Sequence, residues 1–162
     1  MNHIEIVYAF FATFFFAIIF NLRGQKIFFS SVCGALGWYA LLVAEQAKYS
    51  KTASFFIAAI AITIFSELVA KELETPVTTT LIPGLIPLVP GGGIYYTMYY
   101  IVSNEFLAAR AKGMETLSIT VALSVGIFLV STFFQIFNKF FKYLAILRKY
   151  NIEYLNKNWK KR

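Results

Sequence analysis

Long apolar stretches with few charges dominate the pattern of this chain. Four of them, residues 4–22, 27–44, 53–70 and 114–137, are each about long enough to cross a bilayer as a helix of roughly 20 residues. Charge enters these stretches only through Glu5, Glu67 and Glu115, each toward one end. The pattern therefore predicts helices that span a membrane.

A fifth apolar stretch, residues 75–104, carries no charged residue but holds all four prolines, Pro76, Pro83, Pro87 and Pro90. Because proline lacks a backbone donor and clashes with the preceding turn, we expect no regular helix through residues 81–93. Residues 94–102 resume an apolar helix, so the sequence predicts five crossings, the fourth broken by a Pro/Gly motif. A segment that re-enters without crossing is the alternative. Broken backbone survives at membrane depth only beside protein or a water-filled cavity, which favours a transport pathway.

Composition strengthens the membrane assignment and limits the chemistry. With 59% hydrophobic and 14% charged residues, and 18 Phe among 162, the chain is too apolar for a soluble domain, so we predict an all-α integral membrane protein. It has one cysteine, one histidine and no aspartate, which disfavours metal sites, nucleophilic triads and an enzyme, and no cofactor is expected. Cys33 is interpreted as a packing residue. Residues 1–3 lack a positive n-region and no cleavage site follows the first span, so we expect a retained helix rather than a signal peptide.

Basic residues predict the orientation. Eight of the fifteen Lys and Arg residues lie between positions 139 and 162, which places this C-terminal tail in the cytoplasm. We therefore divide the chain into a transmembrane domain, residues 1–138, and a basic amphipathic cytoplasmic tail, residues 139–162, in a cell (inner or plasma) membrane. Five spans then leave four basic residues outside, Lys48, Lys51, Arg110 and Lys112. The tail is expected to lie on the bilayer surface, and no nucleic-acid partner is needed.

The Pro/Gly motif supplies the candidate binding site. Backbone without side chains is presented at Gly91, Gly92 and Gly93, just before the new helix, and a helix start offers N–H groups and partial positive charge to a carboxylate. Pro83, Gly84, Pro87 and Pro90 complete the site. A tight turn that only redirects the chain explains the spacing equally well. Tyr96 and Tyr100 share a helix face and could line a cavity, although an interfacial aromatic belt is the commoner explanation.

Glu67 is the candidate proton-coupling residue. Thr63 lies on the same helical face and Ser66 beside it, so a carboxyl group held here could exchange protons during transport. Lys71 follows four residues later, in the order that favours an ion pair, and an interfacial ion pair is the simpler alternative. In the second span, Ser30, Gly34, Ala35 and Gly37 predict close approach of another helix.

The run P-G-L-I-P-L-V-P-G-G-G-I-Y-Y-T-M-Y, from Pro83 to Tyr99, resembles the C-terminal membrane half of the threonine/serine exporter family. The resemblance implies a stand-alone small subunit that exports small amino acids or dicarboxylates such as succinate, driven by the proton gradient. It also implies a larger membrane subunit, because full-length exporters carry a further N-terminal half. A structural subunit that only scaffolds this partner is the alternative function.

Overall fold

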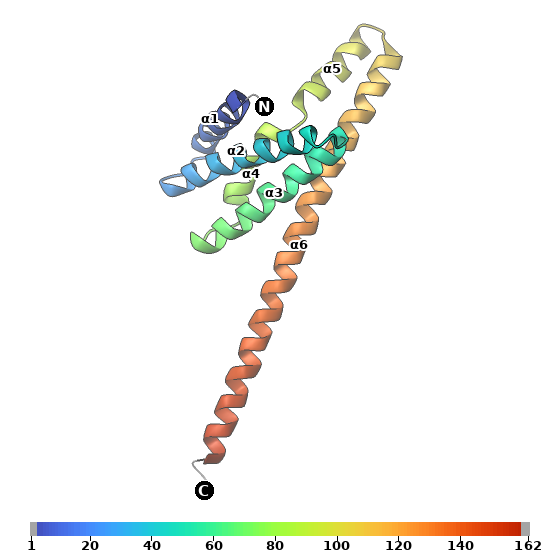
Figure 1. Ribbon diagram of the computed structural model, residues 1–162. Coiled ribbons are helices and arrows are strands. Elements are labelled where there is room, and N and C mark those ends of the chain that lie inside the picture. The colour runs from blue at the N-terminus through green and yellow to red at the C-terminus, as the bar shows by residue number, and fades with distance from the viewer. Residues whose placement is uncertain (1–2, 160–162) are drawn as a thin grey trace. The chain divides into compact units, whose positions relative to one another are not determined.

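A computed structural model of the chain consists of helices and turns over the residues that it describes (Figure 1). It describes residues 3–159, with side-chain placement for residues 4–140. The elements are α1 (His3–Ile19), α2 (Gln25–Gln46), α3 (Lys51–Glu72), α4 (Thr78–Leu85), the 3-10 turn η1 (Ile86–Leu88), α5 (Gly91–Val102) and α6 (Phe106–Trp159). The predicted all-α fold is confirmed.

Three helices are long and apolar enough to cross a bilayer, namely α2, α3 and the Phe106–Phe140 part of α6. Their length and apolar composition indicate a membrane protein. α1 has 17 residues and so rises only about 26 Å, against a hydrocarbon core of about 30 Å. α4 and η1 together are shorter still. The count of five crossings therefore stays a prediction.

Four helix ends share one geometry. After each of α1, α2, α3 and α5 a residue adopts the left-handed conformation, and the next N–H donates back to a carbonyl five residues earlier, as in a Schellman motif. The left-handed residues are Asn21 (φ 58°), Lys48 (φ 61°), Glu74 (φ 49°) and Asn104 (φ 59°). The backbone bonds are Leu22 to Ala17 (3.0 Å), Tyr49 to Ala44 (3.2 Å), Thr75 to Ala70 (3.0 Å) and Glu105 to Tyr100 (2.8 Å). This motif ends α1 at Ile19, three residues before the predicted end of the first span.

Helix α2 is the centre of the packing and contacts α1, α3, α4 and η1. Small residues let these neighbours approach: a methyl group added at Gly34 would collide with the Thr13 hydroxyl of α1. At Gly37 it would lie 2.5 Å from Ile62 of α3 and 3.1 Å from Leu88 of η1. The close approach predicted for the second span is confirmed at both glycines.

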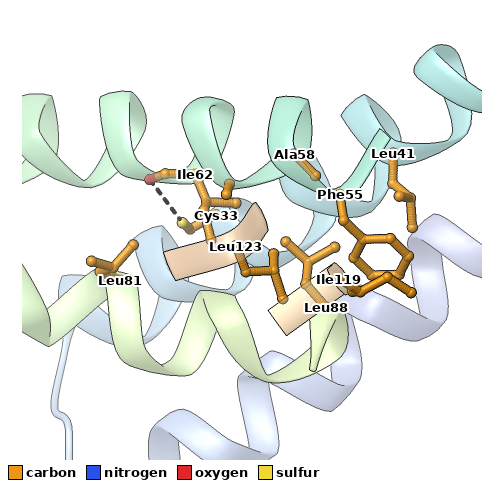
Figure 2. Close-up of a cluster of buried hydrophobic side chains, with 10 residues drawn as sticks. Cys33, Leu41, Phe55, Ala58, Ile62, Leu81, Leu88, Ile119 and Leu123 are labelled. Atoms are coloured by element: carbon orange, nitrogen blue, oxygen red, sulfur yellow. Dashed lines mark hydrogen bonds between the residues drawn. The ribbon is translucent and has the colours of Figure 1, made fainter. Parts of the chain in front are cut away.

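The buried apolar core lies between α2, α3 and α4 and is closed by α6 (Figure 2). Ile62 and Leu88 are fully buried at its middle, and Ile119 and Leu123 of α6 pack against the same cluster. The remaining members are Cys33, Leu41, Phe55, Ala58, Ala59 and Leu81. Because Leu88 belongs to η1, this core anchors one part of the Pro/Gly motif.

The chain divides into two compact units, residues 1–130 and residues 131–162. The first holds all the helix packing described above. The second is the C-terminal part of α6, helical through Trp159. The predicted tail, residues 139–162, falls in it, and its side chains from residue 141 onward lie outside the described residues. Its amphipathic character and surface binding stay predictions.

Candidate functional site

The first half of the Pro/Gly motif is helical, so the expectation of no regular helix through residues 81–93 is wrong there. α4 continues to Leu85 with Pro83 inside it. Proline at this position leaves the carbonyl of Thr79, four residues earlier, without its usual N–H donor. The Ser30 hydroxyl of α2 donates to that carbonyl at 3.4 Å. A neighbouring helix thus replaces the hydrogen bond that the proline removes.

Helix α4 ends at Leu85, and residues 86–90 leave the α-helical conformation. Ile86–Leu88 tighten into the 3-10 turn, and Val89 is extended (φ −62°, ψ 127°). Pro90 then occupies the centre of an inverse γ-turn (φ −74°, ψ 54°), closed by the Gly91 N–H donating to the Val89 carbonyl at 2.7 Å. Helix α5 begins at Gly91, three residues before the predicted start at Ile94.

The start of α5 is open. Gly91 and Gly92 are exposed, and a Cβ atom added at either would meet nothing within 4 Å. No side chain caps the helix. Because the first N–H groups of a helix have no intrahelical acceptor, this bare backbone is accessible to an external anion. Gly93 differs, because a Cβ there would collide with the Thr116 hydroxyl of α6.

A cavity of about 100 Å³ lies beside this helix start, between α3, α5 and α6. Its wall includes Pro90 and Gly93 together with three charged side chains from the two other helices. The Glu115 carboxylate accepts from the Lys51 ammonium at 2.8 Å and from the Lys112 ammonium at 2.8 Å. We call this space the triad cavity, after Lys51, Lys112 and Glu115.

A second cavity, of about 260 Å³, lies on the α1 side of the motif. Pro87 forms part of its wall, with Tyr8 and Ala12 of α1. The Trp38 indole N–H donates to the Glu5 carboxylate at 3.2 Å within it. Pro87 and Pro90 therefore border different cavities, on either side of the interruption.

The remaining predicted site residues are placed less directly at these spaces. Pro83 and Gly84 are buried residues of α4, and a Cβ at Gly84 would lie 2.6 Å from the Cys33 sulfur of α2. Tyr96 is about half exposed (49%), and its ring lies 6.4 Å from that of Tyr100. Neither tyrosine lines the two cavities described above.

Glu67 is buried on α3, with 6% of the residue exposed. Thr63 and Ser66 are buried beside it, and the Ser66 hydroxyl lies 3.4 Å from the Cys33 sulfur. The positive charge of Lys71 attracts the Glu67 carboxylate. Glu67 thus lies next to buried hydroxyl residues of its own helix, at the opposite end of α3 from Lys51.

Sequence reasoning missed the triad. It counted Lys112 only as one of the basic residues outside the membrane. In the structure α6 begins at Phe106 and carries Lys112 one turn before Glu115. The Lys112 and Glu115 spacing of three residues was a visible signal of a local pair. Lys51 joins them from 64 positions away, and nothing in the local pattern indicates that contact.

Comparison with family models places the chain. The model described as Threonine/Serine exporter, ThrE, matches residues 5–133, most of the sequence. The chain belongs to the threonine/serine exporter family. The match covers α1 through most of the apolar part of α6, so both cavities lie inside the exporter region. Comparison with curated proteins and with solved structures gave no match.

Proposed function

We propose that this threonine/serine exporter chain is the small subunit of a secondary transporter that exports threonine, serine or dicarboxylates such as succinate. The observation that carries the proposal is the uncapped, glycine-lined start of α5 beside a cavity lined by two lysines. Membership of an exporter family gives this geometry its context. The segment 83–93 would form part of the substrate path.

In this proposal the substrate carboxylate binds at the start of α5. The N–H groups of Gly92 and Gly93 offer donors where no side chain blocks approach at Gly91 and Gly92. Pro87 and Pro90 keep the backbone interrupted, and the Tyr96 and Tyr100 pair would shape the path as α5 moves. The buried packing of Pro83 and Gly84 would give this moving part a fixed support.

Glu67 is the proposed proton-coupling residue. It is the buried carboxyl group of α3 and lies among hydroxyl side chains. If the C-terminus lies on the cytoplasmic side of a plasma membrane, Glu67 lies at the cytoplasmic end of α3 and the triad cavity lies at its outer end. An outward path would therefore pass from a proton-exchanging group toward a cationic exit.

A larger membrane subunit is the proposed partner. The exposed apolar faces of α1 and α5, which carry side chains such as Phe15 (60% exposed) and Met98 (62% exposed), offer room for lipid and for that subunit. A purely structural subunit is the alternative. It would need the small-residue contacts of α2 and α4, but not the open backbone at Gly92.

Gly92→Val tests the proposal. Because an added side chain meets open space at this position, the variant should fold and reach the membrane while its side chain blocks the backbone. We expect efflux of threonine, serine and succinate from loaded vesicles, normalised to assembled protein, to be abolished. Ala111→Val, which introduces the same side chain at an exposed position of α6, is the control and should keep its efflux. Unchanged normalised efflux in Gly92→Val would remove this segment from the binding site.

A further inference from the structure

One carboxylate holds two lysines in the triad cavity. Glu115 uses a different oxygen for each, Oε1 for Lys51 and Oε2 for Lys112, both at 2.8 Å. The ammonium groups come from two helices, α3 and α6, and converge on a single carboxylate. The three side chains sum to one positive charge, so the cavity is cationic even with Glu115 in place.

These ion pairs are exchangeable. The side chains are partly open to solvent, at 53% for Lys51, 29% for Lys112 and 35% for Glu115. Ion pairs of that exposure contribute little to stability. The contact of α3 with α6 does not depend on them, since Ile119 and Leu123 join the core and a Cβ at Gly126 would lie 2.9 Å from Ala59. Glu115 can therefore leave the lysines without separating the helices.

We infer that the triad cavity is a carboxylate-binding site. In it the substrate carboxylate and the Glu115 carboxylate compete for the ammonium groups of Lys51 and Lys112. This inference rests on the proposed function and adds side-chain ligands to it. The replacement exchanges one carboxylate for another, so the charge in the cavity is unchanged. About 100 Å³ is room for a few water-sized groups, which suits the carboxylate end of a small organic acid.

Pro90 and Gly93 connect the open start of α5 to the triad cavity. Both line the triad cavity at the start of α5, where the open backbone of Gly92 is next in the chain. A carboxylate that leaves the helix start thus reaches the lysines as its next cationic partner. When Glu115 pairs again with the two lysines it displaces the solute, so the positive charge of the cavity does not hold the solute there.

Equilibrium binding of radiolabelled threonine, serine and succinate tests the inference. The tagged full chain is purified with any subunit that accompanies it and placed in nanodiscs of neutral lipid. Glu115→Gln removes the competitor but keeps its size, and should lower the dissociation constant about two- to fivefold, the range set by a partly exposed pair. Lys112→Met should raise it by a similar factor. Glu105→Gln, a matched charge change on an exposed residue outside the cavity, should leave it unchanged.

The outcomes separate the two proposals. If the unaltered chain binds none of the three solutes, both the carboxylate site and the transport function are overturned. If it binds them and Glu115→Gln weakens or does not alter binding, the competition is overturned while the transport function stands. Repeating the measurement with anionic lipid covers a phosphate headgroup as occupant. Tighter lipid retention by Glu115→Gln without tighter solute binding would assign the lysines to lipid and contradict the inference.

Discussion

The two Pro-Gly steps of the interrupted segment have the same sequence and opposite surroundings. Pro83-Gly84 is buried in α4, and a Cβ at Gly84 would press on the Cys33 side chain and approach the Gly34 nitrogen to 3.5 Å. Pro90-Gly91 opens α5, and a Cβ at Gly91 would meet nothing within 4 Å. In the first step glycine permits helix contact, and in the second it leaves backbone bare. The motif therefore joins a fixed support to an accessible helix start.

Placing the same valine in both halves should give the largest contrast. Gly84→Val would put Cβ 2.6 Å from the Cys33 sulfur and 3.1 Å from its Cβ, and overpacking of this kind costs typically about 1–3 kcal/mol. We expect a lower unfolding midpoint in detergent and less protein in the membrane. Gly92→Val should change stability by no more than about 0.5 kcal/mol, as exposed substitutions usually do. Equal losses of stability in Gly84→Val and Gly92→Val would contradict the difference in packing between the two halves of the motif.

The local pattern predicted some of this arrangement well. Continuous apolar runs without proline located α2 and α3 to within two residues at each end, because helix length in a bilayer follows from hydropathy alone. The rule that proline breaks helices failed at Pro83 for a non-local reason. Ser30, 49 positions away, supplies a donor to Thr79. The triad was missed for the same kind of reason, since Lys51 and Glu115 meet only once α3 and α6 have packed.

Pro87→Ala probes the junction between the two halves. An alanine here restores an N–H and removes the ring, so α4 can extend past Leu85 and oppose the proposed movement of α5. We expect about tenfold slower export, equivalent to about 1.4 kcal/mol in the barrier, with little change in KM. Vesicle efflux over a range of internal serine concentrations measures both constants. Pro76→Ala, at an exposed proline before α4, is the matched control. A change in KM alone would indicate that Pro87 contacts substrate and does not govern the movement.

The prediction with the smallest expected effect concerns the buried half of the motif, Pro83-Gly84, and how α4 accommodates Pro83. Ser30→Ala removes the hydroxyl that donates to the Thr79 carbonyl and should cost about 1 kcal/mol, because that partly buried acceptor loses its donor. In a Pro83→Ala background, the new N–H at position 83 can donate to the same carbonyl, so Ser30→Ala should cost less. A double-mutant cycle on unfolding free energies measures this coupling, which we expect to be about 0.5–1 kcal/mol.

Ser31→Ala is the control for this cycle, because the Ser31 hydroxyl donates at 2.8 Å to Ile27 within its own helix. Its cost should be the same with proline or alanine at position 83. If Ser30→Ala also costs the same in both backgrounds, the hydroxyl does not substitute for the missing backbone donor. Packing would then hold the helix around Pro83, through contacts such as that of Gly84 on Cys33 and the burial of Leu81 in the core, and would be sufficient to keep a proline inside α4.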